Sequence, residues 1–141
     1  ACPGMVDNVR EVEEEVLAAL VAEERWEDSE SFATSMLDIE RDPMTLYRAA
    51  DAKLGLGKPS EAAILREECL TTELETDALT DDSVLETVRA LCKDLHIANQ
   101  DSAAQTWAAT ALNALESQGE EAAPEWIETF KSLVENLNPM A

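Results

Sequence analysis

Few side chains in this sequence have the type and spacing that catalysis or transition-metal binding requires. His96 is the one histidine, and the residue three positions before it is Lys93, so the Glu-x-x-His pattern of di-iron bundles is absent. A catalytic triad would need the same histidine beside an activated serine or cysteine, and no nucleophile-elbow motif is present. We therefore predict no enzyme activity, no metal site and no other cofactor, with His96 at the solvent-exposed edge of a helix.

Two further segments have the composition of ligand-binding loops without their spacing. The acid-rich stretch 77–86 lacks the central glycine and the alternating ligands of an EF-hand loop. The run Gly55-Leu56-Gly57-Lys58 is too short for a phosphate-binding P-loop and follows a helical pattern instead of a strand. We expect a solvated linker at the first segment and a helix end at the second.

The charge of the chain restricts its partners. Its 31 acidic and 10 basic residues give a formal net charge of −21 at pH 7. Such a charge disfavours nucleic-acid phosphates and anionic membranes, and favours basic or neutral partners. No run approaches the roughly 18 apolar residues that span a bilayer. We therefore predict no nucleic-acid partner and no membrane partner.

The three cysteines indicate a reducing compartment. Cys2, Cys69 and Cys92 form no CxxC pair, and their odd number leaves at least one unpaired in a monomer. A cytoplasmic location is the expectation, with Cys69 and Cys92 buried on the apolar stripes of two helices. Residues 1–8 are expected to be a flexible N-terminus or a cloning remnant.

Apolar residues recur at helical spacing along the rest of the chain, and alternating strand patterns are absent. In the first predicted helix, Val9, Val12, Val16 and Leu20 form one apolar stripe. Prolines, glycines and capping residues punctuate this pattern. The predicted helices begin near Val9, Trp26, Pro43, Pro59, Ser83, Asp101 and Pro124.

Local signals mark several of these boundaries. Asp42 before Pro43 is typical of a capped helix start, and Gly55 and Gly57 of a helix end. Ser83 and Glu86 have the spacing of a capping box.

Small residues recur where two helices of a pair could cross closely, at Ser29, Ala62 and Ala104. The sequence resembles tetratricopeptide repeats, which place two helices in a period of about 34 residues. The spacing is irregular, because Ser29 and Ala62 are 33 positions apart and Ala62 and Ala104 are 42 apart. The residues that match the repeat pattern are Val16, Leu17, Leu20, Trp26, Ser29 and Leu37, then Leu46, Ala49, Ala50, Gly57 and Ala62, then Val88, Leu91, Cys92, Leu95, Ala104 and Ala108.

The resemblance implies an all-α fold of about seven helices over a single domain, residues 9–141. Antiparallel helix pairs would stack as a short right-handed solenoid, and the last helix, with Trp126, Ile127 and Phe130 on one face, would cap its open end. The alternative is a helical bundle without repeats.

The same resemblance implies a concave groove lined by the first helix of each pair, acidic at one end and basic at the other. Tyr47 could anchor a peptide or pack between helices, and Arg89 with Lys93 could bind an acidic group or form a surface salt-bridge network. The clamp with which chaperone-tail binders of this family hold their ligand is not expected, because Glu14 and Ala18 occupy corresponding positions. The predicted partner-binding residues are Met44, Tyr47, Asp51, Leu54, Glu86, Arg89, Lys93 and His96, with Glu11, Glu14 and Val21 in the first pair.

Together these patterns predict an adaptor that binds a peptide or helix of a partner protein. One alternative is an acidic chaperone or mimic that shields a basic protein. Another is a structural subunit of a larger assembly, whose faces are completed by oligomerisation or by the remainder of a longer chain.

Overall fold

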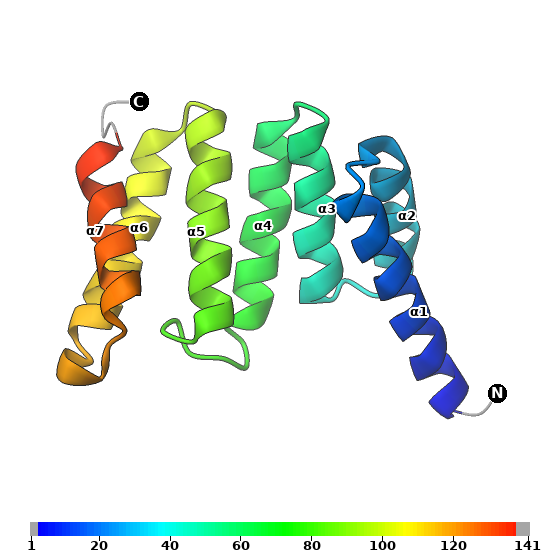
Figure 1. Ribbon diagram of the computed structural model, residues 1–141, viewed down its shortest axis with the longest axis horizontal. Coiled ribbons are helices and arrows are strands. Elements are labelled where there is room, and N and C mark those ends of the chain that lie inside the picture. The colour runs from blue at the N-terminus through cyan, green and yellow to red at the C-terminus, as the bar shows by residue number, and fades with distance from the viewer. Residues whose placement is uncertain (1–2, 138–141) are drawn as a thin grey trace. The chain divides into compact units, whose positions relative to one another are not determined.

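The computed structural model describes residues 3–137, with side chains from residue 9 onward, and this part of the chain contains helices and no strands (Figure 1). The result confirms the predicted all-α class with seven α-helices. The solenoid itself remains a prediction. Cys2 and the side chains of residues 1–8 lie outside the described residues. The helices are α1 (Pro3–Ala22), α2 (Trp26–Ile39), α3 (Pro43–Gly55), α4 (Pro59–Glu73), α5 (Asp82–Ile97), α6 (Asp101–Glu116) and α7 (Pro124–Asn136), with a short 3-10 helix, η1 (Gly119–Glu121), before α7.

The chain divides into two compact units, residues 1–69 and residues 70–141. The first, unit 1, contains α1, α2, α3 and most of α4; the second, unit 2, contains the end of α4 and the helices α5, α6 and α7. The single domain expected over residues 9–141 stays a prediction.

The boundaries of α3 follow the predicted signals. Asp42 has an extended backbone, and its carboxylate accepts a hydrogen bond from the Thr45 amide at 3.4 Å, while Pro43 occupies the first turn. At the other end Gly57 has a φ of +76°, the left-handed conformation that stops a helix at little cost for glycine. A Cβ on Gly55 would overlap the indole ring of Trp26, so this glycine also lets α2 approach the end of α3.

Most of the apolar stripe predicted for the first helix does not face the core, although its last member, Leu20, is partly buried. Val9, Val12 and Val16 are 59%, 57% and 40% exposed, whereas Leu17 is 1% exposed. α1 begins at Pro3 and packs against both α2 and α3 through the neighbouring face, which carries Leu17 and Val21. Periodicity identified the helix correctly but assigned the wrong side to the core, because a helix with apolar residues on much of its circumference has no single preferred face.

The capping box predicted at the start of the fifth helix does not form. α5 begins at Asp82, Asp81 occupies the N-cap position without a side-chain hydrogen bond to the helix, and Glu86 pairs with Arg89 instead. Because the helix starts before Ser83, this serine lies inside the first turn and cannot act as the N-cap that a capping box requires.

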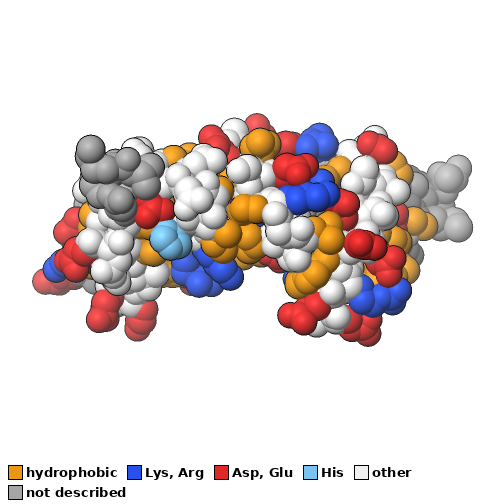
Figure 2. Space-filling model, turned by 90° about the horizontal axis from the view of Figure 1, so that it is seen from above, with side chains coloured by type: hydrophobic (Ala, Val, Ile, Leu, Met, Phe, Trp, Pro, Cys, Tyr) orange, Lys and Arg blue, Asp and Glu red, His pale blue; other side chains and the backbone are white. Residues whose placement is uncertain are grey.

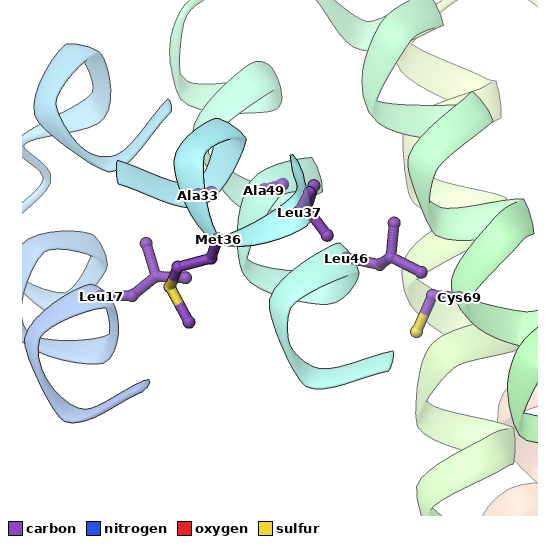
Figure 3. Packing of buried hydrophobic residues seen from close by; sticks show 7 residues of the cluster. All are labelled: Leu17, Ala33, Met36, Leu37, Leu46, Ala49 and Cys69. Carbon is purple, nitrogen blue, oxygen red and sulfur yellow. The ribbon is translucent and has the colours of Figure 1, made fainter. Parts of the chain in front are cut away.

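The core of unit 1 is formed by side chains that converge from four helices (Figure 3). Full burial of a leucine or methionine side chain contributes roughly 1.5–3 kcal/mol, so this cluster holds α1, α2 and α3 together. Tyr47, Phe32, Val21 and Leu65 pack around it and remain partly exposed. The buried members are Leu17, Ala33, Met36, Leu37, Leu46, Ala49 and Cys69.

In unit 2, α5 packs against α6 and α6 against α7. The buried face of α6 is made of Ala104, Ala108 and Ala111, each with no exposed surface. Such small side chains let neighbouring helices approach closely. The thiol of Cys92 on α5 donates to the Ala104 carbonyl oxygen at 3.4 Å, so the two helices approach at Ala104. Ser29 and Ala62, the other predicted crossing residues, also have no exposed surface.

The predicted apolar face of the last helix is only partly buried. Phe130 has no exposed surface, whereas Trp126, Ile127, Leu133 and Val134 remain partly exposed. Trp126 stacks on Phe130 with ring centroids 5.8 Å apart, and its indole nitrogen donates to the Asp82 carboxylate at 3.0 Å. α7 therefore buries one face in the core, and a second face with both polar and apolar residues stays accessible to solvent.

Candidate functional site

The predicted site residues of α3 are mostly engaged within unit 1. Arg66 of α4 is 1% exposed, and its guanidinium lies 4.3 Å from the centre of the Tyr47 ring. The same guanidinium donates to the Asp51 carboxylate at 3.0 Å and to the Tyr47 carbonyl oxygen at 3.2 Å. These contacts use Tyr47 and Asp51 to join α3 to α4. Met44 is 52% exposed, and Leu54 is partly buried.

The predicted site residues of α5 lie together on the surface of unit 2. Arg89, Lys93 and His96 follow one another at spacings of four and three residues, so they share one face of the helix. All three are exposed, and all three line the same cleft. Glu86, the fourth predicted residue, lies one turn earlier and binds Arg89, with 3.1 Å between Glu86 Oε2 and Arg89 Nε. The prediction that His96 lies at an exposed helix edge is confirmed, since 62% of its side chain is accessible.

The second wall of this cleft comes from α7, and the cleft has a volume of about 460 Å³. We call it the α5/α7 cleft. Its floor includes Cys92, which is 1% exposed, and Leu137, which is 7% exposed. Hydroxyl, amide and leucine side chains alternate along the α7 wall. The lining residues are Arg89, Cys92, Lys93 and His96 from α5, with Thr129, Ser132, Leu133, Asn136 and Leu137 from the α7 segment.

The electrostatics of the α5/α7 cleft are opposite in sign to those of the whole chain. The chain carries 31 acidic residues, yet none of the nine lining residues is acidic, and three of them are Arg, Lys or His. Figure 2 shows blue Lys and Arg side chains beside the pale-blue histidine on the face seen from above. Among the described residues, Lys93 has no ion-pair partner within 4 Å. Arg89 is paired with Glu86 and His96 contacts Asp101, so Lys93 is the positive charge of this lining that no described carboxylate pairs with.

His96 is held at the end of α5 by the start of the next helix. Its Nδ1 lies 2.7 Å from an oxygen of the Asp101 carboxylate, and the Asp101 side chain is only 9% exposed. A buried carboxylate at this position fixes the orientation of the imidazole ring and leaves the rest of the ring facing the cleft.

The Cys92 thiol in the floor is not poised for nucleophilic chemistry. Burial raises its pKa to about 12, and the carboxylate of Asp94 adds to the effect. A thiol with this pKa stays protonated at neutral pH, and the thiolate is the reactive form. Cys92 therefore acts as a small apolar side chain here, as the sequence predicted.

A second, more open pocket of about 860 Å³ lies on the other side of α7 and differs in charge. Its lining includes Glu120, Glu128 and Glu135, together with Lys131. Ser132 lines both pockets, so α7 separates a mainly acidic surface from the α5/α7 cleft.

Within residues 9–137, no group of three or more His, Cys, Asp or Glu side chains is placed to hold a metal ion. None of the helices in the described part of the chain combines the length and the apolar run that crossing a bilayer requires. Comparison with protein-family models, with curated proteins and with solved structures finds no match to this chain. The likeness to tetratricopeptide repeats therefore rests on the residues themselves.

Sequence reasoning found the α5 wall of the cleft and missed the α7 wall. A signal for it was present, because Thr129, Ser132 and Asn136 repeat at helical spacing beside Leu133 and Leu137. A polar stripe next to an apolar one on a terminal helix is typical of a half-buried helix, and only the packing shows that it faces Arg89 and Lys93. The eight predicted residues fall in two units, four on α3 and four on α5, so their common groove remains a prediction.

Proposed function

We propose that this chain is a protein-interaction module that binds a peptide or helix of a partner protein in the α5/α7 cleft. The observation that supports the proposal most directly is the cleft itself, a concavity between two helices with an apolar floor and polar walls. Its volume of about 460 Å³ suits inserted side chains, while a helix about 10–12 Å across would lie over its opening. Docking a helix into a groove between helices is a recurring mode of recognition.

The proposal assigns no chemical step to the chain. The cleft contains one thiol, and its raised pKa keeps that thiol protonated. Its histidine already contacts the Asp101 carboxylate. The side chains that remain can donate hydrogen bonds, carry positive charge or contact apolar groups, and these are the properties of a binding surface.

A second candidate function is an acidic chaperone or mimic that shields a basic protein, supported by the net charge of −21. Binding of this kind acts through the field of the whole surface and falls steeply as ionic strength rises. A partner that bound in this way would be released by salt and would be insensitive to single changes in the cleft.

A third candidate is a structural subunit of a larger assembly. The exposed Val9, Val12 and Val16 stripe on α1 supports it, because an apolar helix face of this kind is often covered by another chain. Chain association at micromolar concentration, measured by analytical ultracentrifugation, would be lost in a Val12→Lys variant.

The proposed function is tested by blocking the cleft. Ser132 and Thr110 are both exposed helix residues, on α7 and α6 respectively, so Ser132→Trp fills the cleft and Thr110→Trp is its matched control. Tagged chains carrying each change are used to capture proteins, and the bound proteins are quantified by mass spectrometry. We expect the principal partner to be lost from Ser132→Trp and retained by Thr110→Trp. Equal capture by the two variants would refute the cleft as the binding site.

A further inference from the structure

We infer that the α5/α7 cleft selects an acidic amphipathic helix, in which a row of carboxylates lies beside a row of leucine-like side chains. The inference rests on the proposed function, since it names the chemistry of the partner that this cleft would bind. Its basis is the charge reversal between the cleft and the rest of the chain, together with the spacing of the cationic side chains.

The row formed by Arg89, Lys93 and His96 is too long for one anionic group. His96 is seven positions after Arg89, which corresponds to roughly 10 Å along the helix axis at 1.5 Å per residue. A single carboxylate can reach one of these side chains or two neighbouring ones. A second helix with acids at spacings of four and three residues repeats the same interval. One of its carboxylates could pair with Lys93, and its neighbours would share Arg89 with Glu86 and His96 with Asp101.

The remaining lining requires apolar groups beside those carboxylates. Leu133, Leu137 and the buried Cys92 form an apolar strip next to the α5 row. The Ser132 hydroxyl accepts from the Asn136 amide at 3.1 Å and can donate a hydrogen bond at the rim, whereas the Thr129 hydroxyl donates to the Glu125 carbonyl oxygen at 2.8 Å. A segment with acids alone would leave the apolar strip in water, whereas a leucine row would cover it.

A basic helix is the partner that this lining disfavours. No carboxylate lines the cleft, and the two that adjoin it, Glu86 and Asp101, are engaged by Arg89 and His96, so Lys or Arg side chains placed there would lie beside Lys93 and hydroxyl or amide dipoles. The acidic residues elsewhere on the chain act at longer range, where salt screens them within about 8 Å at physiological ionic strength.

This arrangement gives the binding an unusual kinetic signature. The net charge of −21 repels an acidic partner at a distance, while the cleft attracts it at contact. Added salt should therefore raise the association rate of an acidic helix in the low-salt range, where screening removes the repulsion first. A basic partner attracted by the whole surface would show the opposite trend.

The test uses three fluorescently labelled synthetic helices that share one leucine row and carry Glu, Gln or Lys in the adjacent row. Fluorescence anisotropy measures their dissociation constants with the wild-type chain. We expect the Glu helix to bind at least about tenfold more tightly than the Gln helix and the Lys helix to bind most weakly. Equal affinities, or no detectable binding of the Glu helix, would overturn the inference.

Charge-reversal variants of the protein test whether the Glu helix binds in the α5/α7 cleft. Lys93→Glu places an acid inside the cleft, and Lys131→Glu makes the same change on α7 in the neighbouring pocket. We expect the first to weaken binding of the Glu helix about tenfold or more and the second to leave it unchanged, with circular dichroism showing intact helices in both. A Glu helix carrying a central proline should lose affinity, and unchanged affinity would contradict the helical conformation of the ligand.

The outcomes separate the two proposals. If all three helices bind equally and Ser132→Trp abolishes binding of each, the cleft is a docking site without acidic selectivity, and only the present inference fails. If the Glu helix binds wild type and Ser132→Trp with the same affinity, the cleft is not the site and both proposals fail.

Discussion

Units 1 and 2 are both built from amphipathic helices, yet they use cationic side chains in different ways. In unit 1, Arg66 joins α4 to α3 through Asp51, and Lys53 joins α3 to α2 through Glu30 at 2.7 Å. Their side chains are 2% and 20% exposed. In unit 2, Arg89 is 50% exposed and paired with Glu86 on its own helix, and Lys93 is exposed as well.

Arg10 shows the pattern of unit 1 most fully. From α1 it donates to the carbonyl oxygens of Met36 and Glu40 at 3.3 and 3.1 Å, and to the Thr45 hydroxyl at 3.1 Å. It also pairs with Asp42, the residue that caps α3. One guanidinium therefore connects the first helix to the end of the second and the start of the third.

The contrast suggests which charges determine structure and which serve recognition. A buried pair costs desolvation, and removing one partner is strongly destabilising because the other is left without compensation. An exposed charge contributes little to stability and stays accessible to another molecule. On this basis Arg66 and Lys53 position helices in unit 1, whereas Lys93 of α5 stays accessible.

The largest expected effect comes from breaking the Arg66 contacts. We expect Arg66→Ala to lower the free energy of unfolding by about 3–5 kcal/mol, because it removes the Asp51 pair and the packing under the Tyr47 ring. Urea unfolding followed by circular dichroism measures the change. The matched variant Arg89→Ala should cost less than about 1 kcal/mol. Similar losses for the two would contradict the distinction between the units.

A smaller effect is expected at the helix starts. Asp42→Ala removes both the α3 cap and the Arg10 pair, and we expect a loss of about 1–2 kcal/mol. Asp81 occupies the corresponding position before α5 without a side-chain bond to that helix, so Asp81→Ala should change stability by less than about 0.5 kcal/mol. Thermal unfolding of the two variants compares them directly. A larger loss for Asp81→Ala would contradict the conclusion that Asp42 stabilises its helix start and Asp81 does not.

The smallest effect is pH-dependent and belongs to the Glu30–Lys53 pair. The hydrogen bond from the Lys53 ammonium lowers the pKa of Glu30 below its ordinary value of 4.5. A depressed carboxyl pKa gives stability that is complete above the unfolded-state pKa and is lost as pH falls through the folded-state pKa. We expect Glu30→Gln to cost about 0.5 kcal/mol at pH 7.

Below pH 4.5 that difference should shrink, because the wild-type carboxyl becomes protonated as well. Urea unfolding at pH 7, 5 and 3 follows the trend. Lys53 does not contribute to this trend. The hydrogen bond to Glu30 raises the pKa of Lys53 above 10.5, so Lys53 does not titrate between pH 3 and pH 7. A difference that stays constant down to pH 3 would show that the pair adds nothing to the pH dependence.

Local signals predicted the helices well, because proline, glycine and aspartate act on the backbone within one turn. Pro43, Pro59 and Pro124 each begin a helix, and Gly57 follows the end of one. The errors concern choices that depend on the rest of the structure. Val9, Val12 and Val16 form a proper stripe, yet Leu17 on the adjacent face meets α2 and α3 instead.

For the same reason, the sequence predicted the α5 wall of the candidate site and not its α7 wall. Residues 89, 93 and 96 share a face because of helical geometry alone, so the sequence is sufficient to group them. Their facing wall depends on how α7 packs beside α5, and that is a tertiary property. Tyr47 and Asp51 were predicted to line a groove, but the sequence does not show that Arg66, 15 to 19 residues later, binds both.

Each unit contains a buried thiol whose reactivity would report local unfolding of that unit. Cys69 belongs to the core of unit 1, and Cys92 lies at the floor of the cleft in unit 2, each 1% exposed. With Cys2 replaced by serine, a thiol reagent could modify either residue only when the surrounding helices separate, so the two labelling rates would measure the local opening of each half of the chain. A ligand that occupies the cleft would slow the labelling of Cys92, so the labelling rate of this variant would report whether the cleft is occupied.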